Sequence, residues 1–168
     1  MGGGNLAPEQ ENEVCKWLKK GLLKTDLAIA ADFGHGAISR PIINTLVRRA
    51  PFLAINTQAN AGNRGFHTLT RYPHADYVCI AEHEIRLEMR DLSGQLRPMM
   101  DFLVHKIDCS QFVVTSGKKG CLVRGEGGEF VAVPSTVRLG SCMRGNSPLM
   151  LWGTVDIHLS SFIVNFNA

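Results

Sequence analysis

A short glycine-rich junction between two apolar segments is the part of this chain best suited to hold a phosphate group. It reads Gln111-Phe-Val-Val-Thr-Ser-Gly-Lys-Lys-Gly-Cys121, so Thr115, Gly117 and Gly120 lie where one predicted strand ends and the next begins. Glycine lets the backbone bend and approach a ligand closely, so backbone N–H groups, a hydroxyl and Lys118 can surround an anion there. The same pattern is typical of a plain β-hairpin, and the sequence alone leaves both interpretations open.

A second polar segment follows another buried-looking strand. Asn56-Thr-Gln-Ala-Asn60-Ala-Gly-Asn63-Arg64-Gly65 is rich in turn-forming residues and carries a single charge, that of Arg64. In α/β folds, loops of this kind that follow a buried strand commonly bind ligands. The sequence therefore predicts a binding loop here, in addition to the glycine-rich junction.

Short apolar runs alternate with helical periodicity in the segments that must position these residues. Pro8 begins a predicted helix with apolar residues at three- and four-residue steps, and Ser39 is the predicted N-cap of a second helix that Pro51 ends. Further helices are predicted at 82–90 and 95–107, and strands at 27–31, 52–55, 76–81, 112–114, 121–123 and 130–133. This order predicts an α/β fold with a mainly parallel sheet and helices on both faces.

The domain division expected from these patterns has three parts. Residues 1–8 are predicted to be a flexible lead, residues 9–137 the α/β domain, and residues 138–168 a divergent tail without clear periodicity. A chain of 168 residues is long enough to bury one substantial core. On the predicted helix at 82–90, Glu84 and Glu88 stand four residues apart, which is typical of a solvated helix face rather than a metal cluster.

Composition excludes several classes of protein. The hydrophobic content of 45% and charged content of 20% are ordinary for a globular protein, and a net charge of +3 is too small to indicate nucleic-acid binding. Five widely spaced cysteines without a CxxC pair indicate neither a disulfide framework nor a zinc site. The sequence shows no secretory signal and no apolar span of membrane length, so a cytoplasmic protein with no membrane partner is expected.

Four landmarks in order resemble the ribokinase-like (PfkB) carbohydrate kinases. They are the segments 26–36, 54–66, 75–84 and 113–120, followed by Val131-Ala-Val-Pro134. The resemblance covers roughly residues 9–137 and is closest to the branch that contains heptose-phosphate kinases and sugar kinases fused to a nucleotidyltransferase domain. It implies a ribokinase-like fold and ATP-dependent phosphoryl transfer to a sugar or sugar phosphate, with Mg²⁺ as a second cofactor.

The resemblance also implies roles for individual residues. Thr115, Gly117 and Gly120, with Lys118, would border the phosphates of ATP, and Glu84 would be the acid of the family's Asn-x-x-Glu motif, acting on magnesium through water. The asparagine of that motif is Ala81 here. The predicted substrate-binding residues are Asn56, Asn60, Asn63 and Arg64.

The largest departure from the family pattern lies in the tail. The family's Gly-Ala-Gly-Asp motif supplies an anion hole and an aspartate that acts as general base. The corresponding residues here are Met143-Arg-Gly-Asn-Ser147, so Gly145 remains for the nucleotide while Asn146 stands at the position of the base. An amide does not accept a proton at neutral pH. The family's long amino-terminal part also has no counterpart, so a fragment or a degraded copy is expected.

Three hypotheses remain at this stage. The first is an ATP-dependent carbohydrate kinase, with weak or no activity in this chain alone. The second is a non-catalytic ribokinase-like remnant, and the third an unrelated nucleotide-binding α/β module. Sheet edges left bare by the missing part would favour homo-oligomers.

Overall fold

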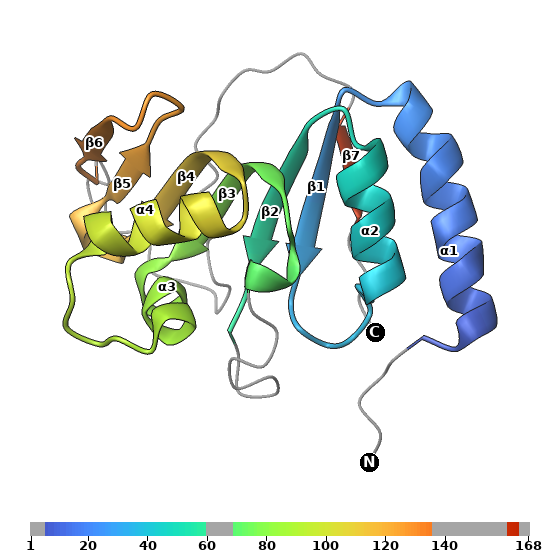
Figure 1. Cartoon of the computed structure of the whole chain (residues 1–168), viewed down its shortest axis with the longest axis horizontal. Coiled ribbons are helices and arrows are strands. Elements are labelled where there is room, and N and C mark those ends of the chain that lie inside the picture. Colours follow the sequence, from blue (N-terminus) through green and yellow to red (C-terminus); the bar gives the residue numbers. More distant parts are fainter. Residues whose placement is uncertain (1–5, 60–68, 136–160, 165–168) are drawn as a thin grey trace, which may run out of the picture.

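A single sheet flanked by helices makes up the part of the protein that the computed structural model describes, namely residues 6–59 and 69–135 and the backbone of residues 161–164 (Figure 1). The α-helices are α1 (Pro8–Gly21), α2 (Arg40–Arg49), α3 (Glu82–Met89) and α4 (Leu96–Lys106). The strands are β1 (Leu27–Asp32), β2 (Leu53–Thr57), β3 (Ala75–Ala81), β4 (Cys109–Thr115), β5 (Cys121–Arg124), β6 (Phe130–Val133) and β7 (Ser161–Val164). Short 3₁₀ turns occur at η1 (Leu22–Lys24), η2 (Leu69–Arg71) and η3 (Gly117–Lys119).

The strands lie in the order β6-β5-β4-β3-β2-β1-β7. Neighbours from β7 to β4 pair in parallel, whereas β5 and β6 add an antiparallel hairpin at one end. The strands β1 to β4 follow one another across the sheet in chain order. Because crossover connections between parallel strands are right-handed, the helices between such strands are expected on the same face of the sheet. The predicted class, α/β with a mainly parallel sheet flanked by helices, is confirmed.

One face of the sheet forms the core together with the helices. A row of paired residues, Ala30, Ile55, Val78 and Phe112, crosses four strands and is almost fully buried. The same core contains residues from every α-helix, namely Leu18, Ile42, Ile85 and Leu103. The adjacent row on the opposite face, Ile29, Ala54, Tyr77 and Gln111, is half-buried to exposed. Within the described residues, the helices therefore share one face rather than both.

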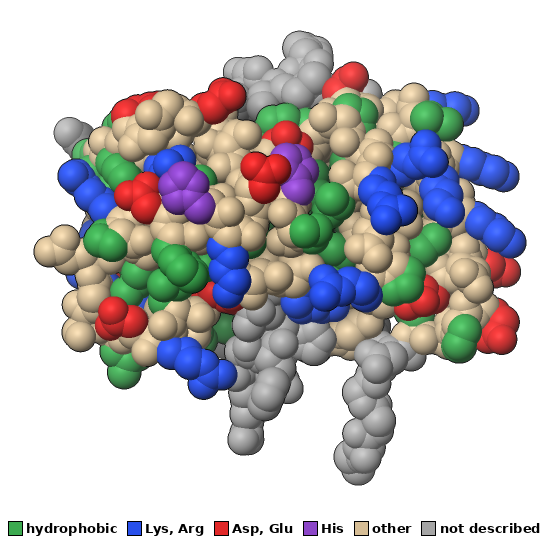
Figure 2. Space-filling view, in the orientation of Figure 1, with side chains coloured by type: hydrophobic (Ala, Val, Ile, Leu, Met, Phe, Trp, Pro, Cys, Tyr) green, Lys and Arg blue, Asp and Glu red, His purple; other side chains and the backbone are tan. Residues whose placement is uncertain are grey.

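Helix α1 follows directly from its sequence pattern. Pro8 occupies the first turn, where its missing N–H costs nothing, and Cys15 and Leu18 face the core. Acidic residues stand in the first turn and Lys19 and Lys20 in the last, which complements the helix dipole. Figure 2 shows Lys and Arg side chains gathered over α1 and α2, with mixed charges elsewhere on this view. Part of this basic surface is therefore explained by the ends of the helices.

Ser39 stands at the predicted N-cap of α2, with extended backbone angles. Its side chain makes no cap hydrogen bond, however, and its Oγ is buried without a partner among the described residues. Pro41 in the first turn supplies a preset backbone angle there. Ser39 thus takes the predicted position of the cap without the side-chain hydrogen bond that usually accompanies it.

The β5–β6 hairpin is joined to α4 by polar contacts. Arg124, buried on β5, donates to Asp101 of α4 at 2.7 Å, and the Arg97 guanidinium lies over the ring of Phe130. The edge strands therefore remain aligned with the core although β6 itself is exposed. Among the helices described here, none is long and apolar enough to cross a bilayer.

Candidate functional site

The parallel strands end at a common edge, and several of the predicted site residues that the structure describes lie at or beside it. Asp32 pairs with Thr57 at the ends of β1 and β2, and Ala81 pairs with Thr115 at the ends of β3 and β4. Ligands of open α/β sheets bind at this carboxyl edge. The topology therefore brings the glycine-rich junction, the start of α3 and the connection after β2 to one side of the molecule.

The glycine-rich junction is a tight reversal between β4 and β5. Ser116 N–H donates to Gly120 O (2.8 Å), Lys119 N–H to Ser116 O (3.1 Å) and Gly120 N–H to Gly117 O (3.0 Å). Among the described residues, no hydrogen bond uses the N–H groups of Gly117 and Lys118. The junction is a β-hairpin, and within the same turn it leaves two adjacent N–H groups for another acceptor.

Its two glycines are needed for different reasons. Gly120 has φ +93°, and a Cβ there would lie 1.9 Å from Val133 O, so its lack of a side chain lets the end of β6 approach the turn. Gly117 has φ +56°, and a Cβ would meet no atom within 4 Å. Packing within the protein explains Gly120. The space beside Gly117 is open to a ligand.

A hollow of about 570 Å³ lies between this turn and the start of α3. It is lined by Ala81, Glu82, His83, Arg86, Thr115, Ser116 and Gly117. Thr115 and Gly117 are exposed, whereas Ala81 is half-buried at the N-cap of α3. The hollow thus joins two of the predicted landmarks, the Thr115 turn and the segment of the Asn-x-x-Glu motif.

Charged side chains along the hollow are already paired. Arg86 donates to Glu82 at 2.8 Å, and its other nitrogen donates to Gly94 O at 3.0 Å. Hydrogen bonds from Arg86 and then from Ser116 hold the pKa of Glu82 below its usual range. Glu82 is therefore an anion that links the first turn of α3 to the Thr115 turn. Lys119 adds a cation near it.

Glu84 stands in the first turn of α3, and its burial contradicts the predicted solvated face. Its side chain is only 10% exposed and accepts hydrogen bonds from Ala81 N–H (2.6 Å) and Ala59 N–H (3.1 Å). The first contact caps its own helix, and the second holds the chain that leaves β2. The i,i+4 spacing alone did not show that backbone N–H groups from elsewhere reach this carboxylate.

These donors offer magnesium little inner-sphere ligation. Within the part of the chain that the structure describes, no three His, Cys, Asp or Glu side chains form a metal-binding group. Glu82 is paired with Arg86, and Glu84 with two N–H groups. Because Mg²⁺ keeps several waters and binds mainly through substrate phosphates, these residues fit a contact through water at most.

Glu88, one turn further along α3, also departs from the predicted solvated face. Its carboxylate accepts hydrogen bonds from Leu69 N–H (3.0 Å) and from the Thr70 hydroxyl (2.7 Å). It is half-buried rather than free in solvent. The side chain of Glu88 thus joins α3 to the chain that enters β3.

Of the residues predicted to bind substrate, the structure describes only Asn56. Asn56 is half-buried on β2 and donates its Nδ2 hydrogen to Cys79 O (2.7 Å), so its amide group joins two strands. Asn60, Asn63 and Arg64 lie outside the described residues, as do Gly145 and Asn146 of the tail. The roles predicted for these five residues stay predictions.

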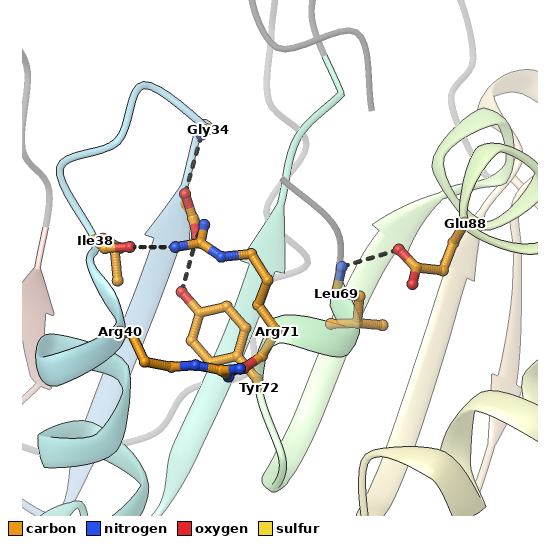
Figure 3. A network of polar contacts seen from close by, with 8 residues as sticks. Gly34, Ile38, Arg40, Leu69, Arg71, Tyr72 and Glu88 are labelled. Carbon is orange, nitrogen blue, oxygen red and sulfur yellow. Dashed lines mark hydrogen bonds and ion pairs between the residues drawn. The ribbon is translucent and has the colours of Figure 1, made fainter. Parts of the chain in front are cut away.

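A buried network that the sequence analysis did not single out lies at the end of β1. The Asp32 carboxylate is 4% exposed and accepts from Gly34 N–H (3.0 Å), Arg71 (3.2 Å) and the Tyr72 hydroxyl (3.0 Å). Arg71 also donates to Ile38 O at 2.7 Å. Figure 3 shows the Arg71 side chain reaching the oxygen of Ile38, with the Tyr72 ring below its guanidinium.

The only sequence signal for this network was an aspartate at the end of an apolar run. Arg71 and Tyr72 follow Asp32 by 39 and 40 residues, and no local pattern joins them. Burial, reinforced by the negative charge of Asp32, raises the pKa of the Tyr72 hydroxyl far above its ordinary value. Tyr72 is therefore a donor to Asp32 and not a titrating catalytic group near neutral pH.

Comparison with known proteins places this fold. No protein-family model and no curated protein sequence matches the chain. Among solved structures, phosphofructokinase-2 from Escherichia coli in complex with fructose-6-phosphate superposes with a TM-score of 0.58 at 14% identity, covering 82% of this chain and 46% of that one. The fold is that of PfkB-type carbohydrate kinases.

Two further structures agree. A PfkB protein from Polaromonas sp. JS666 gives a TM-score of 0.53 at 14% identity over 71% of this chain and 42% of that one. Ribokinase from Arabidopsis thaliana complexed with ribose and ATP gives a TM-score of 0.50 at 10% identity, over 77% of this chain and 39% of that one. The chain thus spans less than half the length of these structures. At such identities the likeness establishes the fold and leaves activity to be argued from the site.

Proposed function

We propose that this chain carries the nucleotide side of an ATP-dependent carbohydrate kinase, with the phosphates of ATP lying against the Thr115 turn. The observation that carries the proposal is the hollow between that turn and the start of α3. The N–H groups of Gly117 and Lys118, which bond to no described residue, stand in the same turn as the exposed side chain of Thr115. Phosphoryl transfer depends mainly on positioning and on neutralising charge, which suits such donors.

The structural relatives support the ligand class. Ribokinase of the same fold was solved with ribose and ATP, and phosphofructokinase-2 with fructose-6-phosphate. In this proposal the acceptor is a sugar or sugar phosphate, with Asn60, Asn63 and Arg64 on its side of the edge. Membership of the heptose-phosphate kinase branch, which the sequence motifs resemble, remains part of the proposal, as does a cytoplasmic location.

Magnesium would enter with the nucleotide. When bound, it neutralises phosphate charge, and Glu84 would hold its waters rather than the ion itself. The role that this chain shows for Glu84 is to fix the N-terminal turn of α3 beside the hollow. Its contact with Ala59 fixes the neighbouring connection as well.

The proposal predicts that phosphoryl transfer by this chain is slow. General-base catalysis needs a group that accepts the proton of the sugar hydroxyl, and Asn146 has no such capacity at the position where the resemblance places the base. We therefore infer that the chain alone binds nucleotide and transfers phosphate poorly or not at all. The non-catalytic ribokinase-like remnant is the second candidate function, and Asn146 is the observation that favours it.

Release of ADP from Mg-ATP, measured against a panel of sugars and sugar phosphates, separates these functions. A kinase releases ADP faster with one acceptor than without, and Asn146→Asp raises that rate at least about tenfold if a carboxylate base is the missing part. Nucleotide binding with no acceptor-dependent release in either variant would establish the remnant and remove the kinase.

A further inference from the structure

The connection between β2 and β3 is held at its start by two backbone contacts. Gln58 N–H donates to Asp32 O at 2.9 Å, which continues the pairing of β2 with β1. The next residue, Ala59, donates its N–H to the Glu84 carboxylate at 3.1 Å. Within two residues the chain is therefore tied both to β1 and to the first turn of α3.

The end of the same connection is held by the same two elements. On the α3 side, Glu88 accepts from Leu69 N–H (Figure 3). It also accepts from the Thr70 hydroxyl. On the β1 side, Asp32 accepts from Arg71 and Tyr72. Arg71 O in turn accepts from Arg40 of α2 at 2.8 Å.

The two glutamates stand one helical turn apart, so their side chains lie on one face of α3, about 5–6 Å from each other at Cβ. Each is bonded to a different end of the connection, Glu84 to Ala59 and Glu88 to Leu69. The two ends must therefore lie close together. Side chains on a regular helix set this spacing, which makes it more rigid than contacts between loops.

We propose that Asp32, Glu84 and Glu88 act as positioning residues that clamp both ends of the connection between β2 and β3 against the carboxyl edge of the sheet. Resting on the proposed function, the inference assigns the clamp to the sugar side of the site, because that connection carries Asn60, Asn63 and Arg64. The acids act through backbone N–H groups and Arg71, without touching substrate. Of the two glutamates, Glu88 is the one to which the resemblance to carbohydrate kinases assigns no role.

The contacts have the strength that such a role requires. Hydrogen bonds to a charged acceptor are stronger than neutral ones, and each of the three carboxylates accepts at least two. Asp32 is almost fully buried, and Glu84 is 10% exposed. Loss of one carboxylate should therefore open one end of the connection locally before it unfolds the protein.

The first test measures hydrogen exchange of single backbone amides by NMR. Glu88→Ala should speed exchange at Leu69 on the order of tenfold and leave the core amide of Ile80 unchanged, since a hydrogen bond to a charged acceptor is lost at one site. Glu88→Gln retains one acceptor for Leu69 and should restore most of the protection. Glu126→Ala, an exposed acid in the β5–β6 turn, is the matched control. Unchanged exchange at Leu69 in Glu88→Ala would overturn the clamp.

The second test uses Mg-ATP and fructose 6-phosphate as separate probes in thermal melting. Glu88→Ala should weaken the shift caused by fructose 6-phosphate several-fold and leave that caused by Mg-ATP unchanged, a split that mere loss of stability does not produce. If Glu88→Ala fails to fold, Thr70→Val, which removes the hydroxyl that donates to Glu88, carries the same comparison.

The outcomes separate the two proposals. A wild-type protein shifted by neither probe overturns the proposed function, and the exchange data then decide the clamp alone. A wild-type protein shifted by both probes, with Glu88→Ala shifted equally by both, overturns the positioning role while the proposed function stands.

Discussion

Tyr72 shows at the scale of single residues how burial fixes a protonation state. Its ring is fully buried, and its hydroxyl donates to the Asp32 carboxylate at 3.0 Å. Ionising it would place a second negative charge beside Asp32 in a low-dielectric interior. Burial first and the charge of Asp32 second therefore raise its pKa above the ordinary value.

A raised pKa in the folded state makes stability fall in alkaline solution. Above pH 10, the ordinary pKa of tyrosine, the unfolded chain loses the Tyr72 proton while the folded protein keeps it, so the free energy of unfolding decreases. The loss is present only above pH 10 and reaches about 1.4 kcal/mol for each further pH unit. Urea unfolding of wild type and Tyr72→Phe between pH 8 and 11 measures this slope. Tyr72→Phe should lose less stability over that range, and equal slopes would contradict the account.

The same residues show what the sequence can and cannot predict about the site. The Thr115 turn was found because glycine spacing is local, and the structure places it beside the start of α3. Asp32, Arg71 and Glu88 were missed or misassigned because their partners are 18 to 40 residues away in the chain. Local pattern gives a residue's type and element. It does not give the long-range partner that decides whether a carboxylate is solvated, paired or part of a clamp.

The element that carries the proposed phosphate contacts is the turn between β4 and β5. Its fold depends on Gly120, whose backbone meets the end of β6, and its openness depends on Gly117. At either position, a residue with a side chain would lower the free energy of unfolding by roughly 1–2 kcal/mol, because its backbone has a positive φ. Steric overlap is added at Gly120 alone.

Alanine substitutions at these two glycines should therefore differ in stability. Gly120→Ala places a Cβ 1.9 Å from Val133 O and should cost well above 2 kcal/mol, because backbone must move, while Gly117→Ala should cost roughly 1 kcal/mol. Chemical unfolding of both variants at pH 7 measures the difference. Equal losses, or a larger loss at Gly117, would show that the turn is not built as described.

Element prediction succeeded where apolar periodicity defines an element and erred at its ends. The strand predicted at 112–114 begins earlier, at Cys109, because Ser110 and Gln111 are recruited by pairing with β3 rather than by their own polarity. The cap of α2 shows a similar limit. Ser39 occupies the predicted position, but its hydroxyl bonds to no described group, since side-chain rotation depends on the tertiary surroundings.

At the scale of the molecule, the sheet ends among its described strands at β6 on one side. Val131 and Val133 are 53% and 44% exposed on that strand. An exposed apolar edge strand offers unpaired N–H and C=O groups to another chain. The proposed homo-oligomer would form by edge pairing of this kind.

Sedimentation velocity tests that association. Wild type should show a dimer that grows with concentration, and Val131→Lys should shift it toward monomer, because lysine on an edge strand opposes pairing. Leu92→Lys changes an exposed apolar side chain in the loop before α4 and serves as the control. A purely monomeric wild type, or a dimer equally weakened by both variants, would contradict edge pairing.

Thermal melting with Mg-ATP tests most directly whether the Thr115 turn lies against nucleotide phosphates. Nucleotide at roughly a hundred times its Kd should raise the wild-type midpoint by about 5 °C or more, since binding to the native state alone stabilises it. Gly117→Ala and Gly117→Leu share the same backbone cost, but only the leucine fills the space beside the turn. The account predicts that the shift survives in Gly117→Ala and disappears in Gly117→Leu. No shift in wild type, or an equal shift in all three proteins, would contradict it.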